Sequence, residues 1–421
     1  SYNIQVRKSK GGGSLNVLVI NAGSSSLKYQ LLNVETHALL AKGICERVGS
    51  AEAFHKHGID ENEVVIDTPM PDHNAAMALV LEALTSGPTK AIESLDDIDA
   101  VGHRVVQGGK YFDRSVLIDD DVVAKIDELA ELAPLHNKAA LMGIEACREQ
   151  MPGKPMVAVF DTSFFQTIPP KAYMYPLPYE LYEKHAIRKY GAHGTSHRYI
   201  AERATAFMDE PLEDLKLITC HLGNGCSISA IDHGVAVDTS MGLTPLDGLM
   251  MGTRCGAIDP AIVPFIMEKE NLTAAEVNDL MNKKSGLLGI SGISNDLRSV
   301  RQASEEGDER AQLAYDMYSN SAKKYIGQYI AVMGGVDAIV LTAGVGENCD
   351  KMRRLIFGGL QPLGIKIDLE KNRKGLRGER EISTDDSEVR IVIIPTDEEY
   401  MIARDTYQLV KEGTLEITEL A

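Results

Sequence analysis

Two glycine-rich segments, far apart in the chain, carry residue types that bind phosphate. Residues 21–28 read Asn-Ala-Gly-Ser-Ser-Ser-Leu-Lys, and residues 221–227 read His-Leu-Gly-Asn-Gly-Cys-Ser. Each lies between two apolar or alternating runs, which predicts strand, tight turn, strand. Glycine lets the backbone approach an anion closely, and the N–H groups of such a turn can point at phosphate oxygens. Two such turns in matching context predict a duplicated domain that closes on a nucleotide from both sides.

The first segment also offers an amide and a cation that suit a metal-bound phosphate. Asn21 can ligate magnesium through its amide oxygen or through a water, and Lys28 supplies positive charge. The segment lacks the Gly-x-x-x-x-Gly-Lys spacing of a P-loop, so the P-loop fold is not implied. An ordinary serine-rich hairpin turn is the alternative, and this segment alone leaves the two interpretations equally open.

Two histidines stand one helical turn apart in the segment His193-Gly194-Thr195-Ser196-His197. A zinc pair is disfavoured, because no Glu follows the first His and no third ligand is obvious. The segment instead predicts a loop that enters a helix, with Thr195 or Ser196 as the helix cap. An imidazole at such an entrance suits a hydrogen bond to a phosphoryl oxygen.

Two arginines stand in glycine-framed turns. Arg254 lies between Gly252 and Gly256, and Arg104 follows Gly102 at the exit of an apolar strand. A single arginine at a strand end usually makes an ion pair at the rim of a sheet. Two of them in so acidic a chain favour recognition of an oxyanion.

Polar groups at other strand ends complete the candidates. Asp161 ends an apolar strand and is either a helix cap or a catalytic carboxylate. The segment Gly344–Asn348 follows a strand and opens a helix, at the strand end where α/β folds bind nucleotides, although Gly-x-Gly alone is a weak signal. Residues 295–298 (Asn-Asp-Leu-Arg) can contact a base or ribose or cap a helix, and the sequence does not decide.

Composition restricts the classes of function. The chain has 421 residues, 44% of them hydrophobic, and a formal net charge of -18. This charge argues against nucleic-acid and membrane partners, and it requires that any phosphate site concentrate positive charge locally. Six sparsely spaced cysteines predict reduced thiols, and no apolar run reaches membrane-spanning length.

Alternating strand-like and helix-like segments predict an α/β protein. Strands are expected at 15–20, 28–34, 41–48, 100–106, 156–160, 217–231 (a hairpin), 234–238, 338–341 and 389–394. Helices are expected at 73–85, 119–132, 137–150, 259–269, 273–282, 308–333 and 397–411. The segment 168–182 is expected to be an irregular crossover near a domain boundary, 375–386 a surface loop, and 1–14 a disordered leader or tag.

In this order, the segments closely resemble the acetate kinases of the acetate/propionate kinase family, from about Asn16 to the last helix. The motifs that carry the resemblance are Val-Ile-Asn-Ala-Gly-Ser-Ser-Ser-Leu-Lys (19–28), Gly-His-Arg-Val-Val (102–106), Ala-Pro-Leu-His-Asn (133–137), Val-Phe-Asp-Thr (159–162), His-Gly-Thr-Ser-His (193–197), His-Leu-Gly-Asn-Gly (221–225), Met-Gly-Thr-Arg-Cys-Gly (251–256) and Thr-Ala-Gly-Val-Gly-Glu-Asn (342–348). Together they are highly specific.

The resemblance implies two actin-like, ribonuclease H-like α/β domains with the active site in a cleft between them. An acyl-substrate domain is expected at 15–165 with a C-terminal helix in 399–421, and a nucleotide-binding and dimerisation domain at 166–398. The family implies a cytoplasmic homodimer that uses magnesium, with manganese as a substitute. Its reaction is reversible phosphoryl transfer from ATP to acetate, giving acetyl phosphate and ADP.

The resemblance also implies roles for individual residues. The catalytic residues would be Asp161, His193, Arg254 and Arg104, and Arg104 would also hold the substrate carboxylate. Acyl-substrate contacts would come from Val106, Leu135, His136, Ala192 and Pro245. Nucleotide contacts would come from Lys28, Ser24, Ser26, His221, Leu222, Gly223, Asn224, Gly225, Asp296, Leu297, Arg298, Gly344, Val345, Gly346, Glu347 and Asn348. The magnesium ligands would be Asn21 and Glu398. Because acetate is already ionised at neutral pH, Asp161 is expected to position the metal or substrate rather than to abstract a proton.

Four positions depart from the family pattern. Gln107 and Phe165 stand where His is expected, Asp397 where Asn is expected, and Ala192 where Phe is expected. The smaller Ala192 predicts more room for the acyl chain, since each further buried CH₂ contributes about 0.8 kcal/mol. Propionate should therefore be accepted better than by relatives with Phe.

Other functions stay open at this point. A propionate or butyrate kinase of the same fold is the nearest alternative, and acyl-chain profiling separates it. An actin-like ATPase module that binds proteins is the alternative of another class, and it would need no carboxylate-binding Arg104. A dehydrogenase is disfavoured, because no acidic residue follows Gly344–Asn348 at the expected distance on a second strand.

Overall fold

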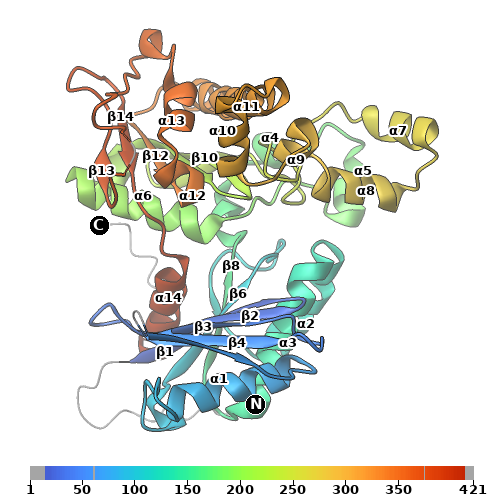
Figure 1. Cartoon of the computed structure of the whole chain (residues 1–421), viewed down its shortest axis with the longest axis vertical. Helices are drawn as coiled ribbons and strands as arrows, with labels where there is room; N and C mark the ends of the chain where they lie inside the picture. The colour runs from blue at the N-terminus through green and yellow to red at the C-terminus, as the bar shows by residue number, and fades with distance from the viewer. Residues whose placement is uncertain (1–14, 60–61, 374, 413–421) are drawn as a thin grey trace. The chain divides into compact units, whose positions relative to one another are not determined.

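The computed structural model describes residues 15–59, 62–373 and 375–412. Contacts within the chain divide it into two units, and most of their helices and strands are labelled in Figure 1. Unit 1 runs to Phe160 and resumes at Glu398, and unit 2 runs from Asp161 to Asp397. The expected leader at 1–14 and the last part of the expected C-terminal segment, 413–421, lie outside the described residues.

Unit 1 is built on an eight-stranded sheet in the order β5-β4-β3-β2-β1-β6-β8-β7. Its strands are β1 (Asn16–Gly23), β2 (Ser26–Asn33), β3 (Ala38–Glu46), β4 (Phe54–Ile59), β5 (Asn62–Asp67), β6 (Ala100–Val105), β7 (Val116–Leu117) and β8 (Met156–Phe160). Strands β1 to β3 are antiparallel neighbours, whereas β6 and β8 run parallel to β1. The expected opening meander is confirmed, and β4 and β5 extend it. The sequence does not predict β4, because His55, Lys56 and His57 interrupt its apolar pattern.

Unit 2 is built on a six-stranded sheet in the order β11-β10-β9-β12-β14-β13. Its strands are β9 (Lys216–Leu222), β10 (Cys226–Asp232), β11 (Val235–Thr239), β12 (Ala338–Thr342), β13 (Arg380–Glu381) and β14 (Arg390–Ile393). Strands β9 to β11 are antiparallel neighbours, and β12 and β14 run parallel to β9. Strands β9, β10, β11, β12 and β14 therefore follow the same order as β1, β2, β3, β6 and β8 of unit 1, and the predicted duplication is confirmed.

The chain crosses between the units twice, and each crossing leads to a helix that packs on the sheet of the unit it enters. The helices of unit 1 are α1 (His73–Thr85), α2 (Asp120–Glu128), α3 (Pro134–Gln150) and α14 (Glu398–Glu412). Those of unit 2 are α4 (Pro170–Tyr173), α5 (Tyr179–His185), α6 (Gly194–Met208), α7 (Ile262–Glu270), α8 (Ala274–Lys283), α9 (Gly286–Ser291), α10 (Leu297–Glu305), α11 (Glu309–Met333), α12 (Ala343–Asn348) and α13 (Asp350–Phe357). After β8 the chain enters unit 2, where α6 packs on β9 and β12. After β14 it returns to unit 1, where α14 packs on β6, β1 and β8.

Several element boundaries differ from the expectations. Helix α3 begins at Pro134, earlier than expected, because proline is favoured in the first turn of a helix. Leu135 and His136 therefore lie in that first turn. The segment 168–182, expected to be irregular, contains α4 and the start of α5, and the loop expected at 375–386 contains β13. No helix of the described residues is long and apolar enough to cross a bilayer.

The apolar run of β1 is buried on both faces of the sheet, which explains why it is unbroken. Leu18 and Ile20 pack in a cluster with α1 on one face. Val17 and Val19 pack in a second cluster with Ile402 and other side chains of α14 on the opposite face.

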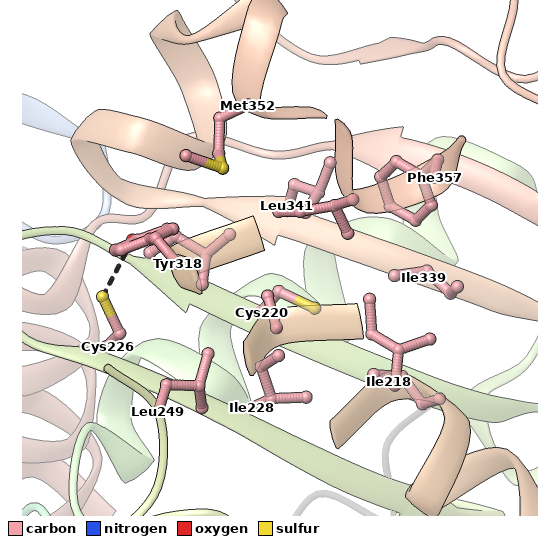
Figure 2. Close-up of a cluster of buried hydrophobic side chains, with 14 of the residues drawn as sticks. Ile218, Cys220, Cys226, Ile228, Leu249, Tyr318, Ile339, Leu341, Met352 and Phe357 are labelled. Carbon is pink, nitrogen blue, oxygen red and sulfur yellow. Dashed lines mark hydrogen bonds between the residues drawn. The ribbon is translucent and has the colours of Figure 1, made fainter. Parts of the chain in front are cut away.

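The main core of unit 2 lies between its sheet and helix α11 (Figure 2). Ile218 and Cys220 of β9 and Leu341 of β12 contribute side chains to it. Tyr318 of α11 enters this core, and its hydroxyl shares a hydrogen bond of 2.9 Å with Cys226 Sγ. Burial raises the pKa of the Cys226 thiol to about 11, so it stays protonated at neutral pH. All six cysteines are free thiols, as expected from their spacing.

A substitution at Gly102 tests how closely α14 packs on β6. A Cβ at this position would lie 2.5 Å from Thr406 Oγ1 and 2.7 Å from Ile402 Cγ2. We expect Gly102→Ala to lower the free energy of unfolding by about 1–3 kcal/mol, because it overpacks this contact. Urea unfolding at neutral pH measures the effect.

Gly327→Ala in α11 is the control. A Cβ there meets nothing within 4 Å, so this variant should be unchanged or more stable by up to about 1 kcal/mol. Equal stability of the two variants would contradict the close packing.

Candidate active site

The second glycine turn joins β9 to β10 as a tight hairpin, and the predicted strand, turn, strand pattern is confirmed. The Gly223 N–H donates a hydrogen bond of 3.0 Å to the Gly225 carbonyl. The Gly252 N–H donates to the Asn224 carbonyl at 3.2 Å and ties the turn to the segment that carries Arg254. A Cβ on Gly252 would lie 2.3 Å from Asn224 Oδ1, so this approach needs glycine.

Two side chains predicted to stabilise the phosphoryl group, those of Arg254 and His193, meet at Gly225. A Cβ built on Gly225 would lie 3.3 Å from Arg254 Nη2 and 3.5 Å from His193 Nε2, so both nitrogens are close to one point. Arg254 Nη1 donates to the Pro245 carbonyl at 2.8 Å, which restrains the guanidinium and places a predicted acyl-pocket residue beside it. Burial lowers the pKa of Arg254, but a guanidinium keeps its charge at neutral pH. The turn thus has the hydrogen-bond donors that a phosphoryl group requires.

A chain of hydroxyl and imidazole groups holds His193 in place. Its Nδ1 and the Nε2 of His197 both share hydrogen bonds with Ser227 Oγ, at 2.8 and 2.7 Å. The Nδ1 of His197 shares a further hydrogen bond of 2.7 Å with Thr219 Oγ1. The ring of His193 also stacks on that of His221, with centroids 4.1 Å apart. The Nδ1 side of His193 is therefore fixed, and its Nε2 remains at the turn.

The zinc interpretation of the two histidines finds no support in this geometry. Both ring nitrogens of His197 are engaged by hydroxyl groups, and its side chain is 0% exposed. Burial lowers the pKa of His197 well below its usual value, and the neighbouring His221 lowers it further, so the ring is neutral at neutral pH. Among the described residues, no group of three or more His, Cys, Asp or Glu side chains could hold a metal ion.

Helix α6 begins earlier than its predicted caps. It starts at Gly194, and His193 occupies the N-cap position with a left-handed backbone, φ 59°. Such a φ is uncommon for histidine, and it is held here by the surrounding contacts. Thr195 and Ser196, predicted as caps, are buried within the first turn instead. The Ser196 hydroxyl shares a hydrogen bond of 2.8 Å with His221 Nδ1 and so orients the second imidazole.

Asp161 packs against the turn that carries His193. The Asp161 carbonyl accepts a hydrogen bond of 2.9 Å from the Gly194 N–H, and a Cβ on Gly194 would lie 2.2 Å from that oxygen. The residue is 1% exposed. The N-cap of the following 3₁₀ helix is Thr162, so the interpretation of Asp161 as a helix cap is wrong. Its catalytic role remains a prediction.

The segment Gly344–Asn348 lies beside the second glycine turn. It belongs to α12, which directly follows β12, as predicted. Ala343 Cβ lies 3.6 Å from the position of a Cβ on Gly223. Arg353, which the sequence analysis missed, donates from Nη1 to two carbonyls at the end of α12, both at 2.9 Å. Burial lowers the pKa of Arg353 to about 10, so it stays charged at neutral pH. No sequence signal reveals it, because its partners there are backbone groups.

The segment 295–298 approaches the same turn from another element. Asn295 Nδ2 donates to Asn224 Oδ1 at 3.2 Å, a link that the sequence does not reveal. Asp296 Oδ1 accepts from the Arg298 N–H at 2.8 Å and caps α10, and its Oδ2 pairs with Arg298 Nη2 at 2.6 Å. The helix-cap alternative is therefore confirmed, and the nucleotide contact stays a prediction.

The residues predicted to bind magnesium and phosphate in unit 1 lie on elements that pack against one another. Asn21 on β1 pairs in register with Lys28 on β2, next to a hairpin turn whose strands end at Gly23 and begin again at Ser26. Glu398 is the first residue of α14, which packs on β1. An amide and a carboxylate are oxygen donors that suit Mg²⁺, and waters usually complete its shell. The donor set fits the predicted ion.

Residues predicted to bind the acyl group are divided between the units. Arg104 lies near the end of β6, and Val106 directly follows that strand. Leu135 and His136 lie in the first turn of α3, and Leu135 is 67% exposed. Ala192, in unit 2, belongs to the main core cluster and is 3% exposed. The acyl pocket stays a prediction.

The topology of the two units defines the class of protein. Three antiparallel strands followed by two parallel strands, present twice, form the arrangement of the actin-like, ribonuclease H-like proteins. The sequence profile of the Acetokinase family matches residues 16–404, and the chain belongs to this family. The resemblance found in the sequence motifs is thereby confirmed.

The relatives match nearly the whole chain. The acetate kinase of Halothermothrix orenii is 56% identical over 399 residues, covering 94% of this chain and 100% of that protein. The acetate kinase of Caldanaerobacter subterraneus subsp. tengcongensis is 57% identical over 400 residues, covering 94% and 99%. The crystal structure of the Porphyromonas gingivalis acetate kinase matches with a TM-score of 0.92 at 46% identity, covering 94% and 100%. The crystal structure of a propionate kinase from Francisella tularensis matches with a TM-score of 0.87 at 42% identity, covering 94% of this chain and 99% of that chain.

The buried His197 makes stability depend on pH. Because its pKa in the folded protein lies below the unfolded value of about 6.5, the unfolded chain binds a proton that the folded ring does not. This contribution to stability is complete above pH 6.5 and is lost as the pH falls below it. Between pH 7 and pH 5, the free energy of unfolding should fall by about 2 kcal/mol less in His197→Gln than in wild type, because the variant lacks this titrating ring. Urea unfolding at the two pH values measures the difference. His185→Gln, which removes an exposed histidine at the end of α5, is the control and should keep the wild-type pH dependence. Identical slopes for wild type and His197→Gln would contradict the assignment.

Proposed function

We propose that this protein is an acetate kinase, which transfers the γ-phosphoryl group of ATP reversibly to acetate. The observation that supports this most directly is the meeting of Arg254 and His193 at Gly225, beside the segments that begin at Ala343 and Asn295. Membership of the Acetokinase family and relatives named acetate kinase agree with it.

The proposed step moves one phosphoryl group between two anions. A carboxylate oxygen of acetate forms a bond to the γ-phosphorus, while the bond from that phosphorus to the β–γ bridging oxygen breaks and ADP leaves. No proton moves, because acetate is ionised at neutral pH. Cations must offset the repulsion, and an arginine at the transferring group contributes about 10³–10⁵ in rate. We assign this charge to Arg254 and a hydrogen bond to the transferring group to His193, with Arg104 on the acetate carboxylate and Asp161 as a positioning group.

We infer that the nucleotide contacts the three unit-2 segments 221–225, 296–298 and 344–348. Lys28, Ser24 and Ser26 of unit 1 would contact its phosphates. Asn21 and Glu398 would hold magnesium, which neutralises phosphate charge when bound. Manganese suits the same oxygen donors.

We also propose a cytoplasmic homodimer. The six free thiols support a reducing compartment. Helix α7 has no buried residue and exposes Ile262 and Phe265, which supports a partner surface on the proposed nucleotide and dimerisation domain, 166–398. We propose the rest of the chain, 15–165 with 399–421, as the acyl-substrate domain. The contact-based unit that ends at Phe160 and resumes at Glu398 has similar bounds and supports this assignment.

Trapping of the acyl phosphate tests the proposed activity. We expect the protein with ATP, magnesium and acetate to form acetyl phosphate, which hydroxylamine converts to a coloured hydroxamate. Chelation of magnesium should abolish the signal, and Arg254→Gln should lower kcat by at least about 10³-fold without unfolding the protein. ATP hydrolysis without hydroxamate would instead support an actin-like ATPase module and reject the kinase.

The acyl profile tests the role of Ala192. If the small side chain leaves room for the acyl chain, wild type should use propionate relatively well, and Ala192→Phe should lower the kcat/KM ratio of propionate to acetate by about fourfold or more, since one CH₂ is worth about 0.8 kcal/mol. Hydroxamate assays with acetate, propionate and butyrate measure the ratio, and circular dichroism checks that the larger ring leaves the fold intact. An unchanged ratio in a folded variant would reject this role.

A further inference from the structure

A hollow of about 260 Å³ opens on the sheet of unit 1 beside α14. Three lysines, two carboxylates and the predicted metal ligand are among the residues that line it: Lys28, Lys42, Lys56, Glu63, Glu399 and Asn21. We call it the lysine hollow. Neither the family motifs nor the proposed reaction assign a role to Lys42 or Lys56.

The register of the sheet places the three lysines on one face. Lys28 pairs with Ile44, which pairs in turn with Lys56 on the next strand. Lys42 lies two residues before Ile44 and therefore projects to the same face. Each lysine is thus a diagonal neighbour of another. Diagonal neighbours lie within reach of long side chains, so the three ammonium groups concentrate positive charge on this face.

The charges of the hollow are only partly balanced. Lys56 Nζ pairs with Glu63 Oε2 at 2.5 Å. That hydrogen bond, with a smaller contribution from Lys42, lowers the pKa of the Glu63 carboxyl. Lys28 and Lys42 are exposed and make no ion pair within 4 Å among the described residues. Glu399 is the other carboxylate in the lining, so positive charge is in excess.

The hollow is continuous with the predicted phosphate end of the site, because Asn21 and Lys28 belong to both. The protein as a whole carries a net charge of -18 and repels polyanions. We propose that the lysine hollow recruits the phosphate-bearing substrate to the first glycine turn, and that Lys42 supplies its principal additional charge. This inference rests on the proposed kinase function. Its ligand is a phosphate-bearing polyanion, either the nucleotide or the acyl phosphate of the reverse reaction.

Salt dependence distinguishes recruitment from direct contact. We expect Lys42→Met to lower kcat/KM for ATP about two- to fivefold at about 0.02 M salt and to leave kcat unchanged. The difference should vanish near 0.5 M salt, where the Debye length is only about 4 Å. Lys42→Arg should behave as wild type. Repeating the measurement with ADP and acetyl phosphate shows which substrate is recruited more strongly.

Lys125→Met is the matched control. Lys125 lies on α2, whose Val122 and Ile126 pack on the opposite face of the sheet from α14, and the substitution removes the same charge. It should change kcat/KM much less than Lys42→Met. An equal loss in the two variants, no loss in Lys42→Met, or a loss that persists at high salt would overturn the proposal.

Calorimetric binding of magnesium ADP separates this inference from the proposed function. Weaker, salt-dependent binding by Lys42→Met than by Lys125→Met supports recruitment even if no acyl phosphate is formed. Equal binding by the two variants rejects recruitment even if the kinase is active.

Discussion

The missing side chain at Gly225 is the constraint on which the unit-2 site depends. Its empty Cβ position is where Arg254 and His193 approach each other. A Cβ there would lie 3.3 Å from Arg254 Nη2 and 3.5 Å from His193 Nε2, so the guanidinium would have to shift by a few tenths of an ångström. The constraint is stronger around the turn, because a Cβ on Gly252 would lie 2.3 Å from Asn224 Oδ1 and one on Gly194 would lie 2.2 Å from the Asp161 carbonyl. The site is therefore formed by close approach of backbone segments, with few side chains added to it.

The histidines of this site have two different roles. His197 orients its neighbours, whereas His193 lies at the glycine turn. His197 is buried and neutral and acts through Ser227, which also holds His193. Such a chain of neutral groups orients an imidazole without adding charge to a region that already holds Arg254. Arg254 therefore places a positive charge beside this turn in a chain whose net charge is -18.

The parts of the fold and site that could be predicted from the sequence are those with local signals. Both glycine turns, the long helix α11 and the strand before Gly344 have periodic apolar patterns or turn residues that mark them. Strand β4 is missed because Lys56 and two histidines conceal its alternation. The roles of Ser227 and Arg353 are missed because each depends on a partner that only tertiary packing brings close. Ser227 binds the imidazole of His193, and Arg353 binds backbone carbonyls of α12. The caps at Thr195 and Ser196 are misplaced because His193 adopts a left-handed backbone that local propensity disfavours.

The return of the chain to unit 1 as α14 has a consequence for biosynthesis. On the ribosome, every strand of the first sheet is synthesised before unit 2, and α14 is synthesised after it. Val17 and Val19 therefore lack their α14 partners while unit 2 is translated. Unit 2 already has all its strands and helices by then. The nascent chain therefore exposes these apolar side chains until α14 has been translated. A ribosome that stalls before Glu398 releases a polypeptide that chaperones and proteases can recognise as incomplete.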